Sequence, residues 1–239
     1  MLHMQHVTKV YRTELVETHA LRSLDLHVAD GEFVAVTGPS GSGKTTFLNI
    51  AGLLEEFTGG EYSLDGVNVK GLNDYARSKL RNEKIGFIFQ SFNLIPDLNL
   101  FDNCDVPLRY RGMPASERQL RIEDALGLVG LSSRMKHYPA ELSGGQQQRA
   151  AIARALAGSP RLLLADEPTG NLDSQMARSV LELLEDINEQ GTTIVMVTHD
   201  PELAARAQRN VHIVDGMATD LGVAPVLARA AQETTSASA

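Results

Sequence analysis

The sequence predicts an α/β fold with a central parallel sheet, to which an antiparallel β portion and a helical insertion are added. Three short apolar runs support the parallel sheet: residues 33–36, 162–165 and 193–197. Apolar runs of about four or five residues are typical of parallel strands that are covered on both faces. Segments with the spacing of helices separate these runs, as expected for a chain that alternates strands and helices.

Composition limits the class of protein. The chain has 239 residues, of which 43% are hydrophobic, and this is enough for one large α/β domain or two small ones. A net charge of -8 argues against a protein that coats nucleic acid. The single cysteine, Cys104, excludes an internal disulfide and is typical of a reducing cytosol. No apolar run approaches about 18 residues and residues 1–11 lack a signal-peptide pattern, so any role at a membrane is expected to come through a partner.

A glycine-rich stretch follows the first apolar run and has the spacing G-x-x-x-x-G-K-[ST] of a phosphate-binding loop. Its small residues allow backbone N–H groups to point at phosphate oxygens, and a helix that starts near Lys44 adds its positive end. We expect Lys44 to neutralise β- and γ-phosphates and Thr45 to offer its hydroxyl to Mg²⁺. The alternative is an ordinary turn between a strand and a helix. The predicted loop consists of Gly38, Pro39, Ser40, Gly41, Ser42, Gly43, Lys44 and Thr45.

Short β segments surround this loop. Tyr11 comes directly after the first of them and could stack on a nucleotide base, although a packed or surface tyrosine is the simpler interpretation. After the loop we expect a helix over residues 45–54. The other expected β segments are residues 4–10, 23–28, 61–69 with a turn at Asp65-Gly66, and a closing hairpin of 211–214 and 217–219.

Two adjacent acids, Asp166 and Glu167, follow the apolar run 162–165. In open α/β sheets ligands bind outside the carboxyl ends of the strands, so these acids should lie next to the phosphate loop. Adjacent carboxylates there are costly without a cation. With Mg²⁺ present, Asp166 would belong to the metal's shell and Glu167 would polarise water. The alternative is a solvated turn after a buried strand.

Gln90 and His199 follow two other predicted strands, residues 85–89 and 193–197. If the first strand lies beside the phosphate site, the Gln90 amide could hold the metal or a water molecule. His199 should reach the same edge of the sheet, where it could donate a hydrogen bond to a γ-phosphate. The alternatives are a glutamine that bonds to nearby backbone and an ordinary surface histidine.

Residues 91–157 are predicted to form a mainly helical subdomain inserted into the α/β core. It ends with a long alanine-rich helix that starts after Leu142. Ser143 and Gln146 have the spacing of a capping box. Gly144 and Gly145 are not explained by capping, because glycine in a helix costs up to about 1 kcal/mol relative to alanine. Two bare backbone positions at a positive helix end are expected where an anion approaches very closely.

The rest of the chain contains an amphipathic helix and a tail. Ser174 is expected to cap the helix, whose core-facing side chains are Met176, Val180, Leu183, Leu184 and Ile187. Residues 222–239 are rich in Ala, Ser and Thr, and we expect a frayed or disordered tail after a single domain that spans residues 1–221.

These motifs occur in the order and spacing typical of the nucleotide-binding subunits of ATP-binding cassette (ABC) transporters, which the chain resembles over residues 1–221. The pentapeptide 142–146, Leu-Ser-Gly-Gly-Gln, is the most specific of them. The resemblance implies a P-loop ATPase fold of this type, with its antiparallel β subdomain and helical insertion. The resemblance also includes Gln90, residues 162–167, Asp173 and His199.

The resemblance implies a role for each motif. Tyr11 would stack on adenine, the loop from Gly38 to Thr46 would bind the phosphates of ATP, and His199 would contact the γ-phosphate. Glu167 would be the general base. Thr45, Gln90 and Asp166 would hold Mg²⁺.

The resemblance also implies a dimer. In this family the signature pentapeptide caps the ATP of a second subunit, so two chains pack head to tail around two ATP molecules. Binding of the partner's nucleotide would therefore involve Ser143, Gly144, Gly145 and Gln146, with Asp173 also near the nucleotide. Intact catalytic residues favour a homodimer.

A closer subgroup is indicated by Gly170-Asn171, where many family members have a serine-alanine pair. This form resembles the ATPases of macrolide exporters, of lipoprotein-release complexes and of cell-division complexes. The implied partners are integral-membrane permeases with periplasmic domains, which would hold the ATPase at the cytoplasmic face of the inner membrane. No nucleic-acid partner is expected.

Other classes fit the sequence less well. Soluble cassette ATPases of DNA repair or of ribosomes usually have tandem cassettes, coiled-coil insertions or zinc modules, and none of these is visible here. A cell-division type of regulatory ATPase that moves no cargo is a further alternative. A P-loop kinase or switch GTPase would leave Gly144-Gly145 unexplained.

Overall fold

The computed structural model describes residues 1–13 and 15–223. Its backbone contacts divide the chain into two compact units. The phosphate-loop unit comprises Met1–Gly71 and the chain from Thr193 onward, and the helical unit comprises Leu72–Thr192. From residue 224 onward, the predicted tail lies outside the described residues.

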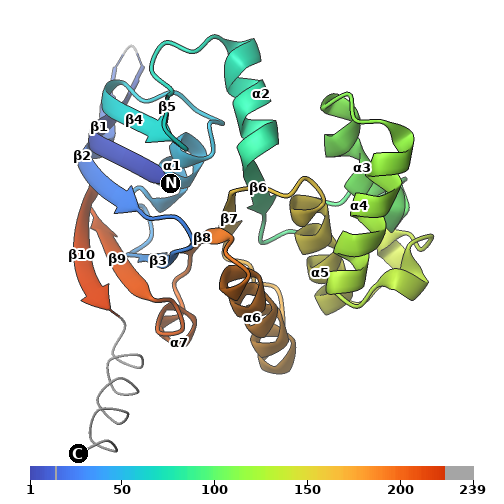
Figure 1. The fold of residues 1–239 in the computed structure, drawn as a ribbon. Helices are drawn as coiled ribbons and strands as arrows, with labels where there is room; N and C mark the ends of the chain where they lie inside the picture. Colours follow the sequence, from blue (N-terminus) through green and yellow to red (C-terminus); the bar gives the residue numbers. More distant parts are fainter. Residues whose placement is uncertain (14, 224–239) are drawn as a thin grey trace, which may run out of the picture. The chain divides into compact units, whose positions relative to one another are not determined.

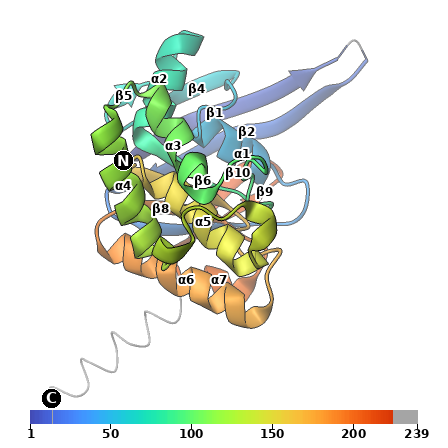
Figure 2. The ribbon, with the colours of Figure 1, turned by 90° about the vertical axis from the view of Figure 1, so that its right-hand side faces the viewer.

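An antiparallel sheet forms one part of the phosphate-loop unit. Its strand order is β2-β1-β4-β5 (Figure 1). The long strands β1 (Leu2–Arg12) and β2 (Glu17–Val28) run side by side in Figure 2. β4 (Gly59–Leu64) and β5 (Val67–Asn68) form the hairpin expected at Asp65-Gly66, where both turn residues have positive φ (48° and 77°). This is the backbone geometry that tight hairpin turns prefer.

The second sheet of this unit contains β3 (Phe33–Thr37), β8 (Thr193–Val197), β9 (Arg209–Val214) and β10 (Met217–Val223). β3 pairs in parallel with both β8 and β9, and β10 pairs antiparallel with β9. The apolar side chains of β3 are buried, as the uninterrupted apolar run predicts. β10 continues to Val223, beyond the strand end expected at residue 219 and the domain end expected at 221.

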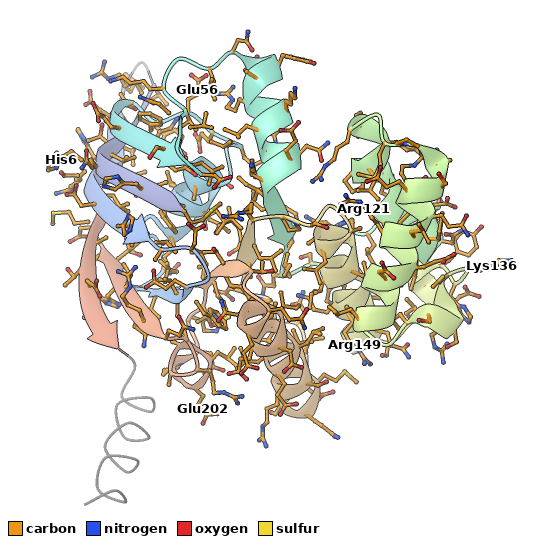
Figure 3. The ribbon with its side chains drawn as sticks, in the orientation of Figure 1. His6, Glu56, Arg121, Lys136, Arg149 and Glu202 are labelled. Atoms are coloured by element: carbon orange, nitrogen blue, oxygen red, sulfur yellow. The ribbon has the colours of Figure 1, made fainter. Side chains whose placement is uncertain are left out.

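Two helices belong to the same unit, α1 (Lys44–Ala51) and α7 (Pro201–Ala204). The prediction that the first of them extends to residue 54 was wrong. Gly52 is the C-cap, and Leu53 has a left-handed backbone (φ 57°) that cannot continue an α-helix. Figure 3 shows Glu202 at the exposed start of α7.

The helical unit contains a parallel strand pair, β6 (Ile85–Ile88) and β7 (Leu162–Asp166), in the register Ile85↔Leu162 to Ile88↔Ala165. β6 ends one residue earlier than expected. The helix before it, α2 (Asp74–Lys84), starts at Asn73, whose side chain accepts the Ala76 N–H (2.9 Å). This side-chain cap satisfies a backbone donor that the helix itself cannot pair.

Helices α3 (Leu100–Tyr110), α4 (Ala115–Leu128) and α5 (Gly144–Leu156) form the helical group expected over residues 91–157 (Figure 1). Two short 3₁₀ turns, Ser132–Arg134 and Pro139–Glu141, connect α4 to α5. α5 packs against α3, α4, α6 and β6. Its small alanines suit this central position, because they allow neighbouring elements to approach closely. Charged side chains such as Lys136 lie at the edge of the group in Figure 3.

The last helix of this unit is α6 (Ser174–Glu189). The predicted cap at Ser174 was wrong. Asp173 is the N-cap, and its Oδ1 accepts the N–H groups of Gln175 (3.0 Å) and Met176 (2.9 Å). Both residues are good caps, and the helical backbone starts one residue before the expected position. Met176, expected in the core, is 37% exposed.

Candidate nucleotide site

The phosphate loop leaves the carboxyl end of β3 and enters α1. Gly38 and Gly43 have positive φ angles, 145° and 106°. A Cβ at Gly38 would lie 2.1 Å from the Ile213 carbonyl oxygen, and a Cβ at Gly43 would lie 2.5 Å from that of Ala20. Backbone oxygens cannot move aside as a flexible side chain can. Glycine is therefore required at both positions by the loop's own surroundings as well as by its conformation.

Hydrogen bonds fix the loop from inside and outside. The Ser42 carbonyl accepts the Gly216 N–H from the β9–β10 turn (3.0 Å), and Lys44 Nζ donates to the carbonyls of Gly38 and Pro39 (both 2.8 Å). The Ser42 side chain is 4% exposed, and its Oγ has no hydrogen-bond partner among the described residues.

The start of α1 differs from the starts of α5 and α6. Its N-cap, Gly43, is left-handed and provides no side-chain cap. Asp173 and Ser143, by contrast, cap α6 and α5 with their side chains. The first N–H groups of α1 are therefore available to an anion, together with the helix dipole and Lys44. The site therefore fits a nucleoside triphosphate in three respects: Gly38 and Gly43 admit no Cβ, the helix start has no side-chain cap, and Lys44 supplies a cation.

Tyr11 lies beside this loop in the same unit. Its hydroxyl donates to Glu55 Oε2 (2.7 Å) and also interacts with the Thr46 hydroxyl. Burial, and next the hydrogen bond to Glu55, raise the pKa of Tyr11. Lys9 Nζ lies 4.9 Å from the ring centre and 3.0 Å from Glu55 Oε1. With 39% of the residue exposed, Tyr11 presents an anchored aromatic ring next to the loop, as base stacking requires.

His199 lies at the same sheet edge as the phosphate loop. β8 pairs with β3 in the register Val36↔Val197, and the Thr198 N–H donates to the Val36 carbonyl (3.1 Å). The chain therefore leaves both parallel strands at neighbouring points, toward Gly38 in one case and His199 in the other. The prediction that these two segments share an edge is confirmed.

Gln90 and the two acids occupy the equivalent edge in the helical unit. Asp166 ends β7, and Gln90 follows β6 by two residues. Because Ile88 is opposite Ala165, both segments leave the strand pair at the same edge. Glu167 has a left-handed backbone (φ 44°), an uncommon conformation for a residue with a side chain and one that occurs often at functional sites.

No cluster of three or more His, Cys, Asp or Glu side chains suited to a metal ion occurs among residues 1–13 and 15–223. The predicted protein ligands, Thr45, Gln90 and Asp166, supply one hydroxyl, one amide and one carboxylate, and these are oxygen donors of the kind that Mg²⁺ prefers.

The predicted signature forms the start of α5. Both hydrogen bonds of the capping box are present, from Ser143 N–H to Gln146 Oε1 (3.0 Å) and from Gln146 N–H to Ser143 Oγ (3.4 Å). The two glycines differ. A Cβ at Gly145 would lie 2.9 Å from Met176 Sδ, so this glycine has a packing reason within the chain that the sequence did not reveal. A Cβ at Gly144 would meet only ordinary contacts, at 3.6 Å and beyond.

Three site neighbours were not predicted. Glu55 holds the Tyr11 hydroxyl, and no spacing in the sequence indicated it. The buried Gln148 side chain donates to the Pro168 carbonyl (2.6 Å), next to Glu167. Asn171 donates to the Gln90 carbonyl (2.9 Å). Of these, only Asn171 carried a signal, because Gly170-Asn171 departs from the common serine-alanine pair.

Comparison with known proteins decides the family. The family model described as ABC transporter matches residues 21–170. The chain belongs to the ABC transporter family. It is 47% identical over 216 residues to the lipoprotein-releasing system ATP-binding protein LolD of Bordetella avium, covering 90% of this chain and 94% of LolD. It is 44% identical to the macrolide export ATP-binding/permease protein MacB of Marinobacter nauticus, again over 90% of this chain but only 34% of MacB.

A solved structure of this family has the same fold. The ATP-binding cassette MJ0796 has been solved as a dimer in a post-hydrolysis state, bound to ADP and Pi, and it superposes with a TM-score of 0.83 at 42% identity. The match covers 92% of this chain and 99% of that structure. The predicted P-loop ABC ATPase fold is confirmed. Within the described part of the chain, no helix has the length and apolarity needed to cross a membrane.

Proposed function

We propose that this ABC transporter ATPase binds and hydrolyses ATP as a homodimer, and that closing and opening of the dimer drive a separate membrane permease. In this proposal each ATP lies between the phosphate loop of one copy and the signature of the other. Mg²⁺ bound with ATP would neutralise phosphate charge. The observation that carries the dimer is Gly144, a bare helix-start position for which the described residues give no steric reason.

Within one copy, the residues act on ATP in distinct ways. Tyr11 stacks on the base, and residues 38–46 hold the phosphates through backbone N–H groups and Lys44. Glu167 accepts a proton from the attacking water, and His199 donates a hydrogen bond to the γ-phosphate. Thr45, Gln90 and Asp166 provide the oxygen ligands for the metal.

The signature acts across the dimer. Ser143, Gly144, Gly145 and Gln146 form the first turn of α5, where backbone N–H groups and the helix dipole favour an anion. At Gly144 a phosphate can approach the backbone without meeting a side chain. The nucleotide then contributes much of the contact between the copies, so that cleavage of the γ-phosphate weakens the dimer. Asp173, the cap of α6, is proposed to lie near the same nucleotide.

The partner is proposed to be an integral-membrane permease with periplasmic domains, as in macrolide export and lipoprotein release. The likeness to LolD and MacB and the Gly170-Asn171 pair support this subgroup. MacB combines ATP-binding and permease functions in one protein by its name, and the match to this chain covers 34% of MacB. The permease would place the protein at the cytoplasmic face of the membrane.

Replacement of Glu167, the proposed general base, tests both its catalytic role and the dimer. Glu167→Gln should bind ATP, lose nearly all hydrolysis and accumulate as a dimer in Mg-ATP, as measured by light scattering. The double variant Glu167→Gln/Ser143→Arg is the matched control and should remain monomeric, because its signature cannot approach the second nucleotide. Unchanged turnover in Glu167→Gln would exclude Glu167 as the base, and a monomer in saturating Mg-ATP would contradict the dimer.

Purification from detergent-solubilised membranes tests the partner. A tagged chain should retain a multi-helix membrane protein, and it should do so in the hydrolysis-deficient Glu167→Gln form as well. Recovery with ribosomes or DNA alone would contradict the transporter proposal and support the soluble class of cassette ATPases.

A further inference from the structure

The segment that carries Gln90 is held by several bonds within the helical unit. The Gln90 carbonyl accepts a hydrogen bond from Asn171 Nδ2 (2.9 Å). Two carbonyls farther along the segment are bound by one guanidinium, since Arg154 on α5 donates to Phe92 (3.1 Å) and also to Asn93. Phe92 and Asn93 both have left-handed backbones, with φ of 61° and 49°. Such conformations persist where the surroundings hold them.

The side chain of Gln90 lies directly against Gly170. A Cβ at Gly170 would lie 2.6 Å from Gln90 Nε2, 3.1 Å from Cδ and 3.3 Å from Cγ, and these are the three nearest atoms. Gly170 does not have a positive φ, so its backbone conformation alone would accept alanine. The three atoms nearest to the space that Gly170 leaves open therefore all belong to the Gln90 side chain.

We propose that Gly170 and Asn171 are positioning residues for Gln90: Gly170 admits the amide side chain, and Asn171 fixes the backbone from which it extends. The proposal rests on the metal-holding role proposed for Gln90 above. Because residues 170–171 follow Glu167 closely, this contact sets Gln90 relative to the loop that carries the base. Arg154 holds the other end of the same segment from α5.

A larger residue at position 170 should lower the rate of ATP hydrolysis more than it lowers the stability of the fold. The end of a glutamine side chain can rotate away at little cost, so Gly170→Ala is expected to displace the amide and leave the fold intact. Misplacement of a catalytic group by about 1 Å can reduce turnover by about a hundredfold. We therefore expect a tenfold to hundredfold lower kcat for Gly170→Ala, about the same KM for ATP and a higher Mg²⁺ requirement.

A double-mutant cycle separates positioning from a general structural effect. In the Gln90→Ala background the three atoms that oppose a Cβ at Gly170 are gone. Gly170→Ala should then have no further effect on kcat or on the Mg²⁺ concentration for half-maximal turnover. Gly127→Ala in α4 is the matched control, because its Cβ would meet only Ser132 Oγ at 3.5 Å. It should leave kcat unchanged.

A measurement without nucleotide provides a second readout. The side-chain amide signals of Gln90 in an NMR spectrum can be assigned by their loss in Gln90→Ala. They should shift in Gly170→Ala and stay in place in Gly127→Ala. Asn171→Asp tests the backbone contact separately, because aspartate has the same shape but no N–H to donate. Its kcat should fall about threefold to tenfold, with an unchanged melting temperature.

The outcomes distinguish the two proposals. If Gln90→Ala leaves kcat and the Mg²⁺ requirement unchanged, the role proposed for Gln90 fails and the positioning proposal fails with it. If Gln90→Ala slows turnover but Gly170→Ala has no effect, or an equal effect in both backgrounds, only the positioning proposal is overturned. If Gly170→Ala does not fold, an Asn171→Asp variant with normal kcat overturns the proposal by itself.

Discussion

Two helix starts with bare glycines, at α1 and at α5, are built in different ways. Before α1 the surrounding chain requires glycine, since a Cβ at Gly38 or Gly43 would meet a backbone oxygen at 2.1 or 2.5 Å. This start has no side-chain cap. At α5 a complete capping box from Ser143 and Gln146 closes the helix, and Gly144 has room for a side chain.

The difference separates glycines that contacts within the chain require from a glycine that no contact within the described part of it requires. The loop before α1 is shaped by contacts within its own unit, and it is the proposed phosphate-binding loop. The start of α5 is a capped helix end whose first glycine has no steric purpose among the described residues. The proposed contact with the nucleotide of a second copy would give this glycine a purpose outside its own chain.

The largest effect is expected in the phosphate loop. Gly38→Ala should abolish ATP binding and lower the free energy of unfolding by about 2 to 3 kcal/mol, because it combines a positive φ with a clash against backbone. Gly41→Ala is the matched variant, since Gly41 also has positive φ (77°) but nothing within 4 Å of its Cβ. It should cost only about 1 to 2 kcal/mol. The free energy of unfolding is measured by denaturation and ATP binding by titration. If Gly38→Ala and Gly41→Ala lost equal amounts of both, the clash assigned to Gly38 would be contradicted.

Substitutions at Ser143 should separate capping from phosphate contact. Ser143→Arg should abolish ATPase activity while ATP binding to the monomer stays nearly intact, as a titration can show. Ser143→Asp retains a good cap, so the melting temperature should be preserved. Its ATPase activity should still be lost, because the carboxylate would repel phosphate. A Ser143→Asp variant with full activity would show that capping is the only role of this residue.

The two signature glycines should respond oppositely to alanine. Gly144→Ala should keep or raise stability, by up to about 1 kcal/mol, and lower the ATPase rate about tenfold. Gly145→Ala should lower stability by about 1 kcal/mol because its Cβ would press on Met176. The double variant Gly145→Ala/Met176→Ala should recover that stability in a denaturation curve. If Gly144→Ala were the destabilising variant, the comparison between the two helix starts would fail.

The smallest effect is expected where Tyr11 is proposed to stack on the nucleotide base. Tyr11→Ala should weaken ATP binding to the monomer about fivefold, toward the lower end of the range for a lost base stack. Tyr11→Phe keeps the ring and loses only the bond to Glu55, so the change should be about twofold. Both effects should be the same in the Ser143→Arg background, measured by ATP titration. A dependence on Ser143 would place the base contact in the dimer and not in the single chain.

Regular elements were predictable where one local rule dominates. The apolar run before Gly38, the turn at Asp65-Gly66 and the capping box at Ser143 all appear as expected. The errors lie at the ends of helices and strands, because contacts with neighbouring segments determine where these elements stop. Leu53 turns left-handed and stops α1 early, and Asp173 replaces Ser174 as cap because both residues can perform that role.

The candidate site was predictable for residues that belong to ordered motifs. Within each unit the structure places strand ends together as expected, Gly38 with His199 and Gln90 with Asp166. Residues that act through a single contact had no such pattern. Glu55 and Gln148 contact partners 44 and 20 residues away in the sequence, and no motif spacing indicates pairs of this kind.

By itself, the sequence determined the fold class and the family and predicted the residues of the nucleotide site, because helix starts, buried strands and phosphate loops depend on residue types at short spacings. Only the tertiary structure decided why individual glycines are present. A Cβ would clash with Ile213 at Gly38, with Met176 at Gly145 and with Gln90 at Gly170, whereas at Gly144 it would clash with none of the described residues. Steric need depends on atoms that folding brings from distant segments, and local sequence contains no record of them.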